Sequence, residues 1–186
     1  MPDYLNEFRT FFPQPSEPIE NKGSWRQVED ELGTPLPSDY KQFIDEYGRG
    51  ILLNLFWVFT PFPSSPTGGV LTAIDEIFAG YRIVSDTHSD ICPYKLFPHD
   101  GGLLPFAQSD NGDELHWLTK GQPDDWHVVM SNLSAMAFHE YEGCSFSKFM
   151  CEIASGRLKS PLIPERFVSA SPRFMLKGRY SSASEG

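Results

Sequence analysis

The chain has 186 residues, of which 40% are hydrophobic and 14% aromatic, and its formal net charge is −10. This length suits one domain with a sizeable core, and the charge disfavours nucleic acid and anionic membrane surfaces as partners. A basic protein partner, or solubility alone, would account for such a charge.

The first half of the chain predicts four helices. Ser24 has the position of an N-cap for the second helix, with Gly33 as its C-cap, and Thr72 predicts a capping box at the start of the fourth. A stretch rich in Phe, Trp and Val over residues 51–60 predicts one or two strands. Apolar residues recur at helical spacing in four segments, residues 4–12, 25–32, 36–47 and 72–81.

The strongest local signal in the second half is Asn111-Gly112, which lies between two apolar runs. Asn and Gly tolerate the positive φ angles of a type I′ turn, so we predict a hairpin over residues 103–118. After the hairpin, the pattern predicts strands over residues 126–130 and 136–141 and then a helix that Ser145 caps. This order predicts an α+β domain, with a mixed or antiparallel sheet of five to six strands and helices packed mainly on one side.

The composition changes after Gly156. Residues 157–186 hold six basic and two acidic residues, a balance of +4, so residues 1–156 carry −14. Prolines and serines favour an extended segment there, which Phe167, Phe174 and Leu176 would pin in part to the domain. We therefore predict a single domain over residues 1–156 and a basic extension over residues 157–186, partly disordered or packed on the domain.

The sequence contains no motif for catalysis or cofactor binding. His139-Glu140 lacks the second histidine of a zincin helix, because Gly143 stands in its place. Residues 110–113 lack the later glycine and glutamate of a calcium loop, and no nucleophile elbow or phosphate-binding glycine loop occurs. We therefore expect no enzyme activity, no metal and no cofactor.

The three cysteines are Cys92, Cys144 and Cys151. Their odd number and irregular spacing do not fit a disulfide framework, and buried free thiols are the simpler interpretation. The first ten residues lack the pattern of a secretory signal, and no apolar run is long enough to cross a membrane. We expect a protein of the reducing cytoplasm.

Acidic residues and large aromatics are the candidates for a binding surface. On the returning strand of the hairpin, Leu115 and Trp117 would face one side and His116 the other, so one side packs on helices and the other can meet a partner. Large aromatics dominate interface energies, although Trp57, Trp117 and Trp126 are each more simply explained as core residues. Six residues are expected to cluster at the hairpin tip and the following loop and to contact a partner: Asp110, Asp113, Glu114, Asp124, Asp125 and Trp126.

Three motifs in order carry a family resemblance: Trp25…Glu29…Leu32-Gly33 with Leu36-Pro37-Ser38-Asp39-Tyr40, Leu104-Pro105-Phe106-Ala107 with Asp110-Asn111-Gly112-Asp113, and Tyr141-Glu142-Gly143-Cys144-Ser145-Phe146. Together they resemble the SUKH superfamily, the SMI/KNR family of bacterial immunity proteins and fungal cell-wall regulators, over residues 20–157. The resemblance implies a non-enzymatic α+β domain that, in bacterial members, binds and neutralises a polymorphic toxin, often a nuclease.

The partner that this resemblance implies is a cognate toxin. A toxin that grips nucleic acid is basic, and an acidic chain would be steered to it. We expect the chain to act as a monomer or weak homo-oligomer. A regulatory or scaffolding module of the same fold, as in fungal relatives, is the alternative, and an uncharacterised hydrolase has no supporting motif.

Overall fold

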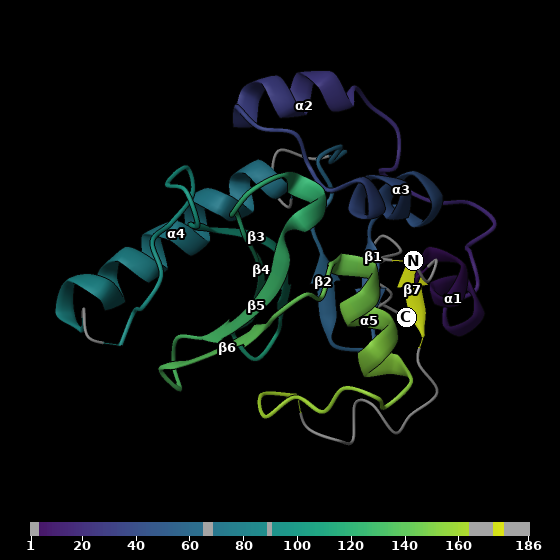
Figure 1. Cartoon of the computed structure of the whole chain (residues 1–186). Helices are drawn as coiled ribbons and strands as arrows, with labels where there is room; N and C mark the ends of the chain where they lie inside the picture. The colour runs from purple at the N-terminus through teal and green to yellow at the C-terminus, as the bar shows by residue number, and fades with distance from the viewer. Residues whose placement is uncertain (1–3, 65–68, 89–90, 164–172, 177–186) are drawn as a thin grey trace, which may run out of the picture.

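The computed structural model describes residues 4–64, 69–88, 91–163 and 173–176. Within them, seven strands form one antiparallel sheet in the order β6-β5-β4-β3-β2-β1-β7 (Figure 1). The strands are β1 (Gly50–Leu52), β2 (Phe56–Val58), β3 (Leu103–Ser109), β4 (Asp113–Leu118), β5 (His127–Asn132), β6 (Ala137–Tyr141) and β7 (Phe174–Leu176). The predicted α+β class and antiparallel sheet are confirmed. The expected strand number is exceeded, because β7 from the extension adds a strand.

In the described ranges, five α-helices accompany the sheet, with a short 3₁₀ helix η1 (Pro123–Asp125). They are α1 (Tyr4–Phe11), α2 (Trp25–Leu32), α3 (Ser38–Tyr47), α4 (Val70–Thr87) and α5 (Phe146–Ala154). Ser24 caps α2, since its hydroxyl accepts a hydrogen bond from the N–H of Gln27, and Gly33 ends α2 with a φ of 75°. The capping box at Thr72 is wrong, because α4 already begins at Val70 after Gly69. None of the helices in the described ranges combines the length and apolarity needed to cross a membrane.

The two faces of the sheet carry different helices. Residues paired across strands point to the same side of a sheet, so the register places Trp117 with Leu104 and Val128 on one face. We call this the α5 face, because Phe146 of α5 packs on it together with α1 and α3. The predicted placement of helices mainly on one side is thus confirmed for these three.

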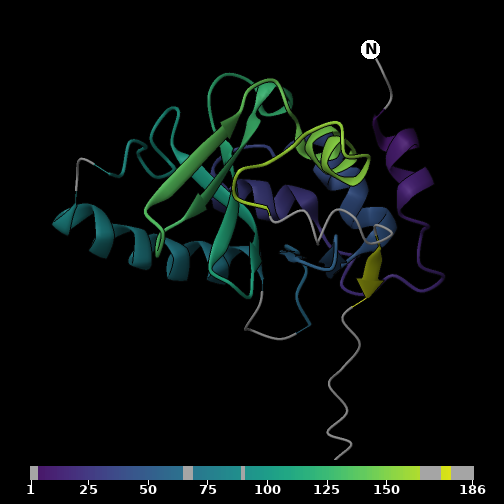
Figure 2. The same cartoon turned by 90° about the horizontal axis from the view of Figure 1, so that it is seen from below.

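Helix α4 covers the opposite face, which we call the α4 face. Tyr81 of α4 is buried in a cluster with Leu103, Leu118 and Val129, and its ring lies 6.0 Å from that of Phe138. All four partners lie on the side of the sheet opposite Trp117 by the strand register. In the view of Figure 2, α4 runs along the side of the strands away from α5.

Aromatic rings fill the core on the α5 face. The ring of Phe8 meets that of Tyr47 edge to face at 5.2 Å, and Tyr40 meets Trp117 in the same way at 4.9 Å. Burying a large apolar side chain contributes roughly 1.5–3 kcal/mol, and such ring pairs add about 0.5–1.5 kcal/mol each. The tyrosine hydroxyls remain satisfied, since that of Tyr47 donates to the carbonyl of Phe12 at 2.5 Å.

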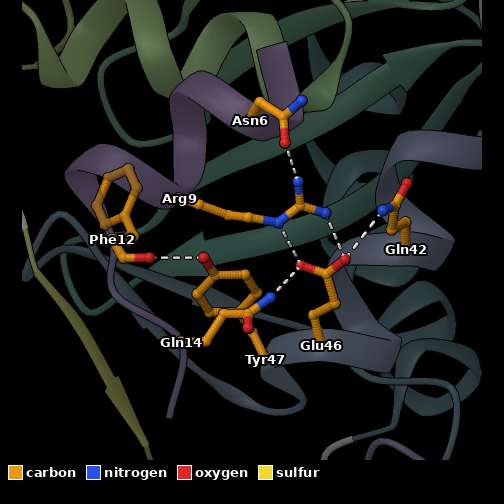
Figure 3. Close-up of polar contacts among 7 residues, drawn as sticks. All are labelled: Asn6, Arg9, Phe12, Gln14, Gln42, Glu46 and Tyr47. Atoms are coloured by element: carbon orange, nitrogen blue, oxygen red, sulfur yellow. Dashed lines mark hydrogen bonds and ion pairs between the residues drawn. The ribbon is translucent and has the colours of Figure 1, made fainter. Parts of the chain in front are cut away.

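A polar junction fastens α1 to α3 (Figure 3). The carboxylate of Glu46 accepts two hydrogen bonds from the guanidinium of Arg9, at 2.6 and 3.0 Å, and further ones from Gln14 and Gln42. Asn6 in turn accepts from Arg9. Hydrogen bonding from Arg9 lowers the pKa of Glu46 below its ordinary value, despite partial burial. Bidentate pairs of this kind fix both partners in orientation as well as distance.

The C-terminal extension reaches the far edge of the sheet. β7 pairs antiparallel with β1, and the ring of Phe174 lies 5.8 Å from Phe43 and 5.2 Å from Tyr47. Phe174 therefore does pin the extension to the domain. Of the other two predicted anchors, Leu176 is half-buried in β7, and Phe167 lies outside the described residues.

Candidate partner-binding surface

The hairpin predicted around Asn111-Gly112 is confirmed, but its turn is of a different kind. Gly112 has a φ of 79°, whereas Asn111 is not among the residues with positive φ. β3 ends at Ser109 and β4 begins at Asp113, so three residues form the loop. A type I′ turn needs positive φ at two central residues, and a three-residue loop with one left-handed glycine is the next common solution.

Asp113 holds this loop from inside. Its side chain is buried, with one oxygen accepting from the Ser109 hydroxyl at 2.8 Å and the other from the Asn132 amide at 2.7 Å. The hydroxyl of Ser109 also accepts the backbone N–H of Asp113. Asp113 therefore joins β3, β4 and β5, and the carboxylate expected to contact a partner is held inside the fold.

The other two hairpin acids are more accessible. Asp110 is exposed and accepts a hydrogen bond from the indole N–H of Trp57 at 2.9 Å. Glu114 is half-buried on the α4 face, where it accepts from the hydroxyl of Ser131 at 3.2 Å. Of the predicted hairpin acids, Asp110 is thus the one whose carboxylate lies open to solvent.

Asp124 of η1 caps a helix far away in the sequence. α3 begins after Pro37, which supplies no side-chain cap, and the carboxylate of Asp124 accepts the N–H of Ser38 at 2.6 Å. A helix N-terminus carries unpaired N–H groups and a partial positive charge, and a carboxylate there satisfies both. The neighbouring Asp125 is exposed, and no ion pair of the described residues involves it.

Two of the three tryptophans are core residues, as the simpler interpretation predicts, and Trp57 is not fully buried. Trp117 is fully buried, and Trp126 is 4% exposed with its ring 6.2 Å from that of Trp117. Both are therefore core residues, and Trp126 is not offered to a partner. Trp57 is half-buried on the α4 face of β2, since it pairs with Gln108, which pairs with Glu114.

The six predicted contact residues do not form one cluster, which corrects the sequence-based expectation. Asp110 and Asp113 lie at the end of β4 that pairs with Asn132, whereas η1 follows Leu118, at the other end. A strand of six residues separates the two groups by roughly 20 Å. The two groups are close in the sequence but far apart in space, because the chain runs along the whole length of β4 between them.

Acidic residues do gather around the connector between α2 and α3. Residues 25–41 together with 123–125 hold six acidic and two basic residues. Glu29 accepts the N–H of Leu36 in this connector at 2.9 Å, and Asp124 accepts the N–H of Ser38, the first residue of α3, at 2.6 Å. These two bonds tie α2 and η1 to the connector. We call its exposed carboxylates the α2–η1 acidic surface; they are Asp30, Glu31, Asp124 and Asp125.

The cations near this surface neutralise only part of it. Lys22 lines the same pocket as Glu31, and two further cations lie on α2 and α3. Lys41 forms an ion pair of 2.8 Å with Glu29, while Arg26 lies 3.7 Å from Asp30 with both side chains more than 70% exposed. Exposed pairs of that kind are worth about 0–1 kcal/mol. Partial burial tends to raise the pKa of Glu29, but hydrogen bonds from Leu36 and Lys41 outweigh it and hold that pKa below its ordinary value. This end of the molecule therefore keeps a negative excess at neutral pH.

One cluster contains the residue types of a hydrolase triad, and its geometry does not match one. Nε2 of His116 lies 2.8 Å from the Ser131 hydroxyl and 3.3 Å from Glu114. In a triad the serine and the carboxylate engage opposite ring nitrogens, whereas here both approach the same one. His116 and Ser131 are also completely buried, so no substrate reaches them. Sequence reasoning missed this cluster, because nothing local links Ser131 to β4.

Two other expectations concern metal and thiol chemistry. Within the described residues, no group of three or more His, Cys, Asp and Glu side chains is placed to hold a metal ion. No disulfide of the described residues involves Cys92, Cys144 or Cys151, and the latter two are buried as the simpler interpretation predicts. Burial raises the pKa of Cys151 to about 12, which suppresses the reactive thiolate.

Comparison with known protein families gives a match over most of the chain. Residues 22–150 match the family model SUKH_6, whose description is SMI1-KNR4 cell-wall. The match covers α2 to β6 and the first half of α5, and leaves α1 and β7 outside. No curated protein and no solved structure matches the chain.

Proposed function

Since the chain belongs to the SUKH/SMI1-KNR4 superfamily, we propose that it is an immunity protein that binds and neutralises a cognate toxin. The partner is a basic protein, such as a nuclease, and the α2–η1 acidic surface covers its nucleic-acid site. The chain acts by occlusion and uses no catalytic residue of its own. It works in the cytoplasm, where its thiols remain reduced.

The observation that carries this proposal is the exposed negative charge of the α2–η1 acidic surface. Glu31 and Asp125 are exposed, and neither belongs to an ion pair of the described residues. A site that grips phosphates presents Lys and Arg, so a rigid array of carboxylates is complementary to it. Complementary potentials raise association rates by roughly 10–10³-fold and suppress wrong partners.

A charge-reversal experiment tests this surface. The chain would be co-expressed with the basic protein encoded beside its gene, and protection of the cells would be measured together with the affinity of the purified complex. Glu31→Lys combined with Asp125→Lys is expected to weaken binding at least about tenfold and to abolish protection. High salt should weaken the wild-type complex in the same direction.

The matched control is Glu76→Lys, which reverses an exposed carboxylate on α4, away from this surface. It should leave protection and affinity unchanged. Asp124 is left out of the design because it caps α3, so its loss would disturb the fold. Full protection by the folded double variant would remove the α2–η1 acidic surface from the interface.

A regulatory or scaffolding module of the same fold is the second candidate. It is favoured by the description of the matching family, which names SMI1-KNR4 and the cell wall. Under this proposal no neighbouring gene encodes a toxin, and expression of the neighbouring proteins without this chain is harmless. A neighbour that kills cells, and is silenced by this chain, would decide for the immunity protein.

A further inference from the structure

A basic pocket lies between α4 and the segment that leads into β3. It has a volume of about 300 Å³ and is lined by aromatic and apolar residues together with Arg82, Lys95 and His99. This volume is at the lower end of the roughly 300–1,000 Å³ found for small-molecule sites. None of the lining residues belongs to the α2–η1 acidic surface.

The wall opposite α4 is held in place by its backbone. The carbonyl of Lys95 accepts from Leu103 at 2.8 Å, and the N–H of Phe97 donates to the carbonyl of Leu103 at 3.1 Å. The carbonyl of His99 accepts from Gly102 at 2.8 Å. A further hydrogen bond joins this wall to α4, since the hydroxyl of Tyr81 donates to the carbonyl of Tyr94 at 2.6 Å. The pocket is therefore preformed, which reduces the entropy cost of binding.

Its positive charge is uncompensated among the described residues. No ion pair there involves Arg82, Lys95 or His99, and no described lining residue is acidic. Arg82 lies over the ring of Phe78, with its guanidinium carbon 5.8 Å from the centroid, which leaves its N–H groups available at the ring's edge. In a chain of net charge −10, carboxylates for such cations are plentiful, so their absence from this lining is a specific feature.

The nearest carboxylate that the hydrogen bonds identify is already engaged. Glu140 accepts from the hydroxyl of Tyr94 at 2.8 Å and forms an ion pair of 2.7 Å with His127. Asp86 and Asp100 are exposed neighbours in the sequence but do not line the pocket. Asp86 lies one turn after Arg82 on α4, yet no ion pair of the described residues joins the two, and an exposed i,i+4 pair would be worth only about 0.3–0.5 kcal/mol.

In a second open pocket, the basic residue is accompanied by acidic ones. It has a volume of about 360 Å³ and contains Arg26, but Glu29 and Asp30 also line it. Its arginine thus faces two carboxylates, and an anion would gain nothing there. This contrast separates the pocket at Arg82 from the general presence of surface arginines.

We propose that the pocket beside Arg82 and Lys95 binds a phosphate monoester whose organic part is aromatic. A guanidinium offers paired N–H donors that fit phosphate oxygens, an ammonium adds a point charge, and an imidazole adds a donor. Tyr94 and Phe97 in the lining supply ring surface for the organic part. The site is independent of the proposed toxin surface.

The test is a calorimetric titration of the full chain with two probes, inorganic phosphate and phenyl phosphate, at constant ionic strength. Phenyl phosphate is expected to bind saturably and at least tenfold more tightly than inorganic phosphate. Arg82→Ala and Lys95→Ala should each weaken it at least tenfold, and its binding should shift the ring signals of His99 in the NMR spectrum. Arg26→Ala, in the second pocket, is the matched control and should change nothing.

The titrations of the variants and of the two probes each support or refute the proposed site. Arg82 and Lys95 are exposed, so both variants should keep the thermal midpoint of the wild type, and two separate variants guard against a misfolded one. Absence of saturable binding of both probes would overturn the proposal, as would equal affinity in all variants. Equal affinity for the two probes would refute the aromatic part of the ligand.

Discussion

Replacing Asp113 by alanine separates a structural from a partner-binding role for this acid. The carboxylate accepts two side-chain hydrogen bonds, from Ser109 at 2.8 Å and Asn132 at 2.7 Å, in a buried environment. Hydrogen bonds to charged groups contribute about 1.5–3 kcal/mol each, and part of this is offset because the buried charge itself is costly. We therefore expect the free energy of unfolding to fall by about 3 kcal/mol.

Urea unfolding measures this loss. With a slope of about 2 kcal/mol per molar urea, the midpoint of Asp113→Ala should fall by about 1.5 M at unchanged slope. Asp110→Ala is the matched control, since Asp110 is exposed and has a single hydrogen bond from Trp57; its midpoint should move by about 0.3 M or less. If the two variants unfold at the same midpoint, the structural role assigned to Asp113 is refuted.

Three further predictions address the α1–α3 junction, the extension and the thiols. Hydrogen bonding from Arg9 lowers the pKa of Glu46. The ionised carboxylate therefore stabilises the fold above the ordinary carboxyl pKa, and this stability is lost as the pH falls through the lowered pKa. Glu46→Gln should be less stable than wild type at pH 7, and the difference should shrink in thermal melts at acid pH. Phe174→Ala should cost about 2 kcal/mol in urea unfolding, roughly half of the loss for a fully buried Phe, because its ring is half-buried against Phe43 and Tyr47; an unchanged midpoint would show that β7 does not dock in solution. Cys151 should not react with a thiol reagent until the chain unfolds, whereas the half-buried Cys92 should react first; rapid labelling of Cys151 in the native state would contradict its burial.

Signals between neighbouring residues predicted the helix ends and the hairpin. The cap of α2 at Ser24 depends on a bond across three residues, and the stop at Gly33 on one left-handed residue. The turn type at Asn111 failed because the sequence pair permits a type I′ turn without requiring it. The hydroxyl of Ser109, which accepts the N–H groups of Asn111 and Asp113, favours the longer loop.

Elements that depend on distant pairing were not predictable. β7 is three residues long and lies on β1 through contacts more than a hundred residues apart, so no local period reveals it. The position of α4 on the face opposite α5 follows from which side of the sheet Tyr81 meets. An amphipathic helix reports that one stripe is buried, and it carries no information about the face that buries it.

The same reasoning explains why the sequence did not show which acidic residues form part of the fold. Asp124 caps α3 across 86 residues, and Asp39 caps α5 across 108, accepting both the N–H and the hydroxyl of Ser147 at 2.9 Å. Each forms part of the fold, although in the sequence each looks like a solvated charge. Asp125, beside Asp124, has no such bond in the described part of the chain and remains exposed. Net charge therefore overstates the number of carboxylates that a partner can meet, and a binding surface in an acidic chain has to be sought among those that no helix N-terminus or buried hydroxyl already holds.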